Sequence, residues 1–276
     1  MRIYATFLNL FNSGIQRIGY RVQIERLKPL NGGRNPIREV VLKSMGFSMF
    51  LDHAESLDMS YKEGVFDFET LDFLRQSLVP GSWFVDLGAN QGLFSCFVLR
   101  NFKNVSVLAI EPDPYSLAKL KMNIELNFGE SPNVRICENG AFSRETKMSL
   151  MINDAGNRAG SSFVIDQRRW TRKSENQSVE VDVKPLGQIL SEYEVGEISV
   201  LKIDIEGSEF EVLENYLHSV APDKLPKNIV LEETHLGLDV GKNSAIEILI
   251  RSGYSLVSHK SPDYFFSKIG VSNLIK

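Results

Sequence analysis

The chain has 276 residues, 43% of them hydrophobic and 24% charged, which suits one large α/β domain with an appendage or two small domains. Its net charge of −4 provides no overall positive field, which disfavours nucleic acid as a partner. The two cysteines have no C-x-x-C spacing, which excludes a thiolate metal site. The sequence contains no apolar run of about 18 residues, so it predicts no membrane-spanning helix. We therefore expect a cytoplasmic protein.

The N-terminal segment combines an apolar helical face with positive charge. Residues 1–20 place apolar side chains near one face of a helix, and residues 1–43 hold eight lysines and arginines against two glutamates. Such a segment can pack on its own domain, on a second copy in a homodimer, or peripherally on an anionic membrane surface.

Two short strands are expected next, at 37–43 and 47–52, and apolar spacing then predicts a helix over 67–78. The helix ends before a Pro-Gly pair and delivers the chain into a central strand. We therefore treat residues 1–60 as an N-terminal helical and β-hairpin extension of a main domain that covers residues 61–276.

The stretch 83–94 has the pattern of a strand, a tight turn and a helix start. Its apolar strand ends at Asp86 and is followed by the turn Gly88, Ala89, Asn90, Gln91 and Gly92. Glycine at 88 and 92 removes side chains where a ligand approaches the backbone, and Asn90 tolerates a left-handed conformation. This geometry predicts a site at the turn.

The turn is spaced G-x-N-x-G, which differs from the G-x-G-x-x-G that binds a pyrophosphate. The carboxylate of Asp86 beside it favours a ligand that carries positive charge. S-adenosylmethionine (SAM), with a sulfonium and an α-amino group, fits this requirement. For the turn alone, an ordinary strand-to-helix connection without a ligand is the alternative.

The next strand, expected at 105–110, ends at Glu111 and Pro112. An acid at a strand tip about 20 residues beyond a glycine turn is placed to accept hydrogen bonds from ribose hydroxyls. Glu111 is therefore the expected ribose ligand, although it could instead cap the helix expected over 115–127. Together the turn and the acid favour a nucleoside ligand.

A third strand at 133–137 ends in a segment that includes Asn139 and Ala141, where such sheets present groups to an adenine ring. Strands at 147–152 and 178–184 then flank a basic linker. The linker holds three candidate substrate residues, Arg158, Arg169 and Trp170. A basic loop with a tryptophan could recognise a phosphorylated or acidic substrate, and a solvated loop is the alternative.

The fourth strand, 199–205, contains Asp204 and leads to Glu206, a fourth candidate substrate residue. The fifth strand, 228–232, leads to Glu233 and His235. A helix follows each strand, and two strands near 254–267 form a terminal hairpin. Alternating strands and helices predict an α/β fold with a mostly parallel sheet of seven strands. Helices should cover both faces, and the hairpin should form an antiparallel edge.

Ligands of such sheets bind beyond the carboxyl ends of the strands, where Asp204 is the main catalytic candidate. It could orient a sulfonium or accept a proton, and His235 is the alternative base because its pKa lies near neutrality. Asp204, Glu206, Glu233 and His235 could also bind Mg²⁺. No compact ligand spacing supports a cation, so we expect no metal.

The motifs together resemble the FkbM family of class I SAM-dependent methyltransferases, which have a Rossmann-like fold. The resemblance runs from about Tyr61 to the end of the chain. Its segments are Val85–Gly92, Ile110–Pro112, Gly140–Ser143, Leu231–His235 and, most specific, Leu201–Glu209.

The resemblance implies that the glycine turn wraps the methionine part of SAM and that Glu111 binds its ribose. It also implies that Asn139 and Ala141 lie near adenine and Asp204 near the transferred methyl group. Family members typically methylate hydroxyls of sugars, glycans or polyketide-like products. The resemblance thus implies O-methylation of a sugar, a glycan or a secondary metabolite.

Two other enzyme classes are alternatives. A nucleic-acid or protein N-methyltransferase shares the fold, but nucleic-acid amino-methyltransferases carry an Asp/Asn-Pro-Pro-aromatic segment where this chain has Asp204-Ile-Glu-Gly. A nicotinamide-dependent oxidoreductase is disfavoured by the spacing of the glycine turn.

Overall fold

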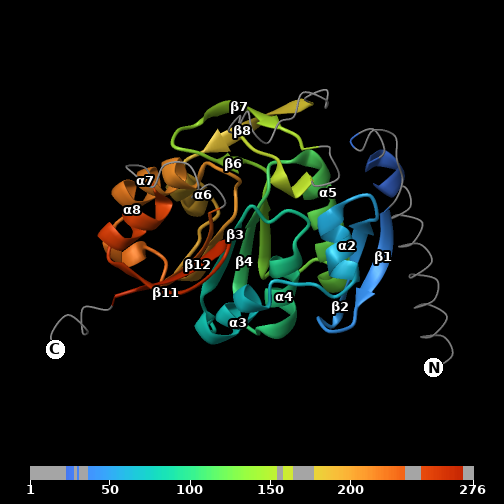
Figure 1. Ribbon diagram of the computed structural model, residues 1–276, viewed down its shortest axis with the longest axis horizontal. Coiled ribbons are helices and arrows are strands. Elements are labelled where there is room, and N and C mark those ends of the chain that lie inside the picture. The colour runs from blue at the N-terminus through green and yellow to red at the C-terminus, as the bar shows by residue number, and fades with distance from the viewer. Residues whose placement is uncertain are drawn as a thin grey trace.

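The computed structural model describes residues 23–27, 30, 37–153, 158–163, 177–233 and 244–269. Figure 1 shows a central sheet between two groups of helices, with a hairpin on one side and a small sheet across one end. Within these ranges, no helix has the length and apolar character needed to cross a membrane. The helix expected over residues 1–20 lies outside the described residues.

Seven strands form the central sheet in the order β11-β12-β10-β9-β3-β4-β5. Along the chain their bounds are β3 Trp83–Leu87, β4 Ser106–Ile110, β5 Val134–Cys137, β9 Ile198–Ile203, β10 Asn228–Glu232, β11 Tyr254–Lys260 and β12 Asp263–Lys268. The five strands from β10 to β5 are parallel, whereas β12 is antiparallel to both β10 and β11. The predicted mostly parallel sheet with a terminal antiparallel hairpin is therefore confirmed.

The pleat of the strands divides the interior into two hydrophobic cores, because successive side chains point to opposite faces. Phe84 of β3 lies in one core, whereas Val85 and Leu87 lie in the other. The helices that cover the first core are α3 Phe68–Ser77, α4 Leu93–Asn101 and α5 Pro114–Phe128. The helices that cover the second are α6 Leu186–Glu192, α7 Glu209–Ser219 and α8 Ala245–Arg251.

The N-terminal hairpin packs against α5. Strands β1 (Ile37–Leu42) and β2 (Phe47–Asp52) pair antiparallel, as expected, and helix α2 (Ser56–Lys62), which was not expected, follows them. The side chain of Asn123 on α5 accepts a 2.7 Å hydrogen bond from the backbone N–H of Phe50. Apolar side chains of the hairpin share the core of α3, α4 and α5. The boundary expected between residues 60 and 61 falls inside α2.

A second sheet of three strands lies across the carboxyl ends of the central strands (Figure 1). Its strands are β6 Gly140–Ala141, β7 Thr146–Met151 and β8 Ser178–Lys184, in the order β6-β8-β7. The sequence predicted β7 and β8 but not the short β6. A single 3₁₀ turn, Arg158–Gly160, follows β7, and another, Pro222–Lys224, precedes β10.

Candidate functional site

A cavity of about 490 Å³ lies where the central strands end. Its wall is formed by the turn after β3, the tips of β4, β9 and β10, helix α2, and residues of the small sheet. Pockets of about 300–1,000 Å³ are typical for small molecules and cofactors. The polar residues expected at this edge of the sheet are therefore collected around a space that can hold a ligand.

The glycine turn is shaped by close packing against the neighbouring strand. Gly88 has a φ of +83°, and a Cβ there would lie 1.8 Å from the backbone oxygen of Asp204. Gly92 has a φ of +88°, and a Cβ there would lie 2.5 Å from the side chain of Leu120. The expected reason for these glycines was the approach of a ligand. In the structure, contacts within the protein already leave no room for a side chain at either glycine.

Asn90 takes the left-handed conformation that the sequence predicted, with a φ of 50°. Its backbone N–H donates a 2.7 Å hydrogen bond to one carboxylate oxygen of Glu111, and the N–H of Asp113 donates a 2.8 Å bond to the other. Each carboxylate oxygen has two lone pairs, so both can still accept from a ligand. Burial and then the nearby Asp113 raise the pKa of Glu111 to about 8.

Glu111 and Pro112 both line the cavity, as do Ala89 and Ala141. Asp86 does not: its side chain is fully buried below the turn and accepts a 2.7 Å hydrogen bond from Ser95 of α4. Burial raises the pKa of Asp86, against the opposing effect of Lys202. Asn139 also lies outside the cavity lining and accepts a long contact from the thiol of Cys137.

Asp204 lies directly after β9 and faces the cavity. The ammonium group of Lys202 donates a 2.8 Å hydrogen bond to its carboxylate, and the Lys202 side chain is only 3% exposed. Burial alone would lower the pKa of Lys202, but the carboxylates of Asp204, Asp86 and Glu232 outweigh that effect, so the pKa is raised. Lys202 is therefore a fixed positive charge below Asp204.

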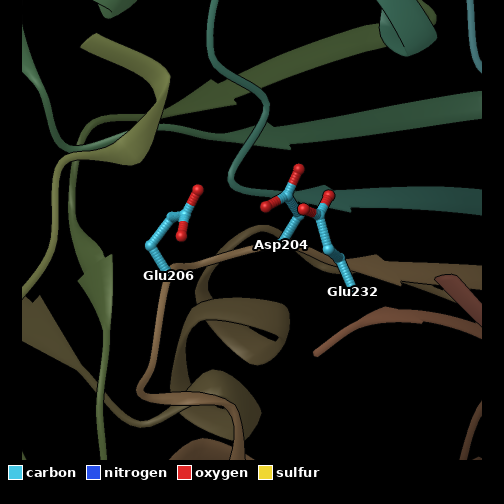
Figure 2. Close-up of side chains that lie close together, drawn as sticks. All are labelled: Asp204, Glu206 and Glu232. Carbon is cyan, nitrogen blue, oxygen red and sulfur yellow. The ribbon is translucent and has the colours of Figure 1, made fainter. Parts of the chain in front are cut away.

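Three carboxylates meet at this end of the cavity. One oxygen each from Asp204, Glu206 and Glu232 lies within 4.8 Å of the others, and Figure 2 shows the three side chains around a common space. Such a set could hold a divalent cation, although the residues differ from those considered on sequence grounds, where Glu233 stood in place of Glu232.

Strand register explains why Glu232 faces the cavity. Leu231 of β10 is level with Ile203 of β9, so Glu232 is level with Asp204, and it pairs in turn with Asp263 of β12. These acids form a row across three neighbouring strands. Glu233 instead accepts hydrogen bonds from backbone N–H groups at the start of α8. The sequence pointed to Glu233 because the register between strands was unknown.

Of the expected substrate residues, Glu206 and Arg158 line the cavity. The guanidinium of Arg158 is already engaged: it donates bonds of 2.8 Å and 3.1 Å to Asp113 and lies 4.8 Å from the ring centroid of Tyr115. Arg169 and Trp170, and the candidate base His235, lie outside the described residues.

The described lining of the cavity is acidic. Two cations reach it, Arg158 and Lys202, and each is paired with an acid. The carboxylates that line it are Asp67, Glu111, Asp113, Asp204, Glu206, Glu232 and Asp263. Opposite charge favours binding, so this part of the cavity suits a cationic ligand and disfavours an acidic one.

Comparison with known proteins identifies the family to which this chain belongs. The model of the Methyltransferase FkbM domain matches residues 86–255, which is more than half of the chain. The chain belongs to the FkbM methyltransferase family. It is a methyltransferase, and its cofactor is SAM.

Relatives among characterised proteins are distant. Methyltransferase 1 of Beauveria bassiana is 26% identical over 181 residues, which are 60% of this chain and 71% of the relative. The 31-O-demethyl-FK506 methyltransferase FkbM of Streptomyces tacrolimicus is 25% identical over 205 residues, 67% of this chain and 77% of the relative. The crystal structure of Methyltransferase FkbM from Methylobacillus flagellatus KT aligns with a TM-score of 0.43 at 17% identity, covering 76% of this chain and 54% of that one.

The residues of this FkbM-family chain fit SAM. An acid at the tip of β4 stands beside the glycine turn, where a ribose can donate to it, and the acidic row at the other end of the cavity complements a sulfonium. Aromatic side chains add an apolar wall, in which Tyr61 and Phe66 stack with ring centroids 5.9 Å apart.

Proposed function

We propose that the protein transfers the methyl group of SAM to a hydroxyl of a sugar, a glycan or a secondary metabolite. The observation that supports this most is the single cavity, which joins Glu111 and the glycine turn to the carboxylates around Asp204. The name of the Streptomyces tacrolimicus relative describes transfer to an oxygen, which supports the same reaction here.

In this proposal the turn from Gly88 to Gly92 contacts the methionine part of SAM, and Glu111 accepts hydrogen bonds from the ribose. Pro112 and Ala141 border the nucleoside, with Asn139 nearby. Asp204, held by Lys202, aligns the sulfonium end. Asp86 acts from below the turn as a buried charge. SAM supplies the reactive methyl group, and the protein supplies alignment, which can contribute about 7–11 kcal/mol.

The acceptor subsite is proposed to include Glu206 and the aromatic wall of Tyr61, Phe66 and Phe94. Carboxylates accept hydrogen bonds from hydroxyl groups, and aromatic faces pack against apolar faces of a substrate. Binding of an acidic substrate by Arg169 and Trp170, and proton transfer by His235, stay predictions from sequence. The same holds for a cytoplasmic location, a homodimer and membrane contact by the N-terminal helix.

Titration of SAM against a Glu111→Gln variant tests the cofactor site. At about pH 9, above the raised pKa of Glu111, a hydrogen bond to its charged carboxylate contributes about 1.5–3 kcal/mol, so we expect SAM affinity to fall about 10- to 100-fold. Glu138→Gln is the matched control, because Glu138 follows the neighbouring strand β5 but points to solvent with a 62% exposed side chain. Equal SAM affinity in the two variants would contradict the assignment.

The reaction itself is tested with radiolabelled SAM and a small-molecule extract. A labelled methyl ether identified by NMR would support O-methylation, whereas a labelled methylamine would favour the N-methyltransferase alternative. A thermal-shift screen with SAM and NAD separates both from an oxidoreductase, because we expect SAM alone to raise the melting temperature.

A further inference from the structure

Glu232 lies at the end of β10 between Asp204, which follows β9, and Asp263 of β12. It ends β10, is half-buried and lines the cavity. Its carboxylate points into the space that Asp204 and Glu206 share (Figure 2). No described residue donates a hydrogen bond to it. Its lone pairs are therefore available to a ligand.

Three neighbouring acidic residues are each held by another part of the protein. One carboxylate oxygen of Asp204 already accepts a 2.8 Å hydrogen bond from Lys202. The backbone oxygen of Glu206 accepts a 2.5 Å hydrogen bond from Ser162, which ties that loop to the roof of the cavity. Glu233 accepts hydrogen bonds from backbone N–H groups at the start of α8. No described residue thus donates to either carboxylate oxygen of Glu232, which lines the cavity, whereas one oxygen of Asp204 is held by Lys202.

We propose that Glu232 is the proton acceptor for the hydroxyl that receives the methyl group, an inference that depends on the proposed O-methylation. As the substrate oxygen bonds to the methyl carbon, the carbon–sulfur bond breaks and its electron pair stays on sulfur. The hydroxyl O–H bond breaks and its proton moves to a carboxylate oxygen of Glu232. The products are the methyl ether, S-adenosylhomocysteine (SAH) and a protonated Glu232, which returns the proton to water.

The charges that face Glu232 support this role. Asp204 and Lys202 face it from β9, Glu206 from the loop that follows β9, and Asp263 from β12. Burial and then the negative charge of Asp204 raise the pKa of Glu232 to about 9, against the opposing effect of Lys202. A general base is most effective when its pKa lies near the working pH. The sulfonium of bound SAM adds positive charge and should lower this pKa towards neutrality.

Calorimetry on the wild-type protein provides a first test without an acceptor. SAM and SAH are titrated at about pH 8.5, close to the raised pKa of Glu232, in two buffers of different ionisation enthalpy. We expect SAM to release more protons than SAH, because SAH lacks the sulfonium charge. Equal proton release for the two ligands overturns the proposal, even should a variant at this position not fold.

The second test compares Glu232→Gln with Glu233→Gln, the adjacent glutamate, which lies outside the cavity lining. Methyl transfer from radiolabelled SAM into a fixed small-molecule extract is measured between about pH 6 and about pH 10. Loss of a general base typically lowers turnover about 10²–10⁴-fold, so we expect that loss in Glu232→Gln at saturating SAM, with the rise of rate with pH abolished. Glu233→Gln should keep the wild-type profile.

Wild-type turnover and pH dependence in Glu232→Gln would overturn this inference while leaving methyl transfer intact. Activity that EDTA abolishes and Mg²⁺ restores would also overturn it, because the three carboxylates would then be ligands of a cation. Failure of the wild-type protein to bind SAM would instead refute the proposed function itself.

Discussion

At the residue scale, Gly88 links the glycine turn to Asp204, the residue that we propose aligns the sulfonium end of SAM. Its missing side chain allows the turn after β3 to approach the backbone of Asp204. A side chain here would therefore displace the turn and Asp204 together. Gly81 provides a natural comparison, because its φ of +84° is nearly the same but nothing lies within 4 Å of a Cβ at that position.

We predict that Gly81→Ala lowers the free energy of unfolding by about 1–2 kcal/mol, because a left-handed conformation is unfavourable for alanine. Gly88→Ala should lower the free energy of unfolding by about 1–3 kcal/mol more, because the added Cβ would clash with the backbone of Asp204. It should also weaken SAM binding, whereas Gly81→Ala should not. Urea denaturation and SAM titration measure the two effects. Similar losses of stability in both variants would show that only the backbone conformation matters.

At the element scale, the N-terminal hairpin and α2 are joined to the cofactor turn by buried polar contacts. Asp58 of α2 forms a 2.5 Å ion pair with Lys119 of α5, and the two side chains are only 3% and 4% exposed, respectively. The amide of Gln91, which lines the cavity, donates to the other oxygen of Asp58. The extension therefore helps to hold the turn in place.

We predict that Asp58→Ala destabilises the protein by about 3–5 kcal/mol, because it leaves the ammonium of Lys119 buried and unpaired. The double variant Asp58→Ala/Lys119→Met should regain part of this stability, yet keep a weakened affinity for SAM because Gln91 has lost its acceptor. Chemical denaturation and SAM titration separate the two effects.

The control for this prediction is the pair of Arg251 and Glu247 on α8, whose side chains are 76% and 41% exposed. Glu247→Ala should cost only about 0.3–0.5 kcal/mol. Recovery of both stability and SAM affinity in the double variant would mean that α2 has no part in shaping the turn.

At the scale of the whole molecule, the acidic cavity makes the protein depend on pH. Burial, with nearby carboxylates, raises the pKa of Glu111 to about 8, of Glu232 to about 9 and of Asp263 to about 7. Their usual values are 4.5, 4.5 and 3.8, so above these values the folded state holds protons that the unfolded state has lost. Stability must then fall as pH rises.

We predict that the free energy of unfolding without SAM declines from about pH 5 to about pH 9, by at most about 1.4 kcal/mol per pH unit for each group. Urea denaturation across this range measures the decline. Glu232→Gln should reduce the decline, because glutamine has no carboxyl proton to lose, whereas Glu138→Gln should not. SAM should oppose the decline more than SAH. Stability that rises over this interval would contradict the assigned shifts.

Part of this fold could be predicted from the sequence alone. Local patterns predicted the strand and turn from Trp83 to Gly92, the strand before Asp204 and the terminal hairpin, because period and turn residues act over a few positions. They did not predict α2 or β6. Both are short, and both are held by contacts to distant segments, such as the ion pair of Asp58 with Lys119.

The sequence by itself determined the mostly parallel sheet with its antiparallel hairpin, the acid at the tip of β4, the left-handed Asn90 and the resemblance to the FkbM family. Only the tertiary structure decided that Asp86 is buried below the turn and that Glu232, instead of Glu233, faces the cavity. The reason is physical. Spacing along a chain fixes local conformation, whereas the register between strands and the depth of burial are set by contacts between residues far apart in sequence.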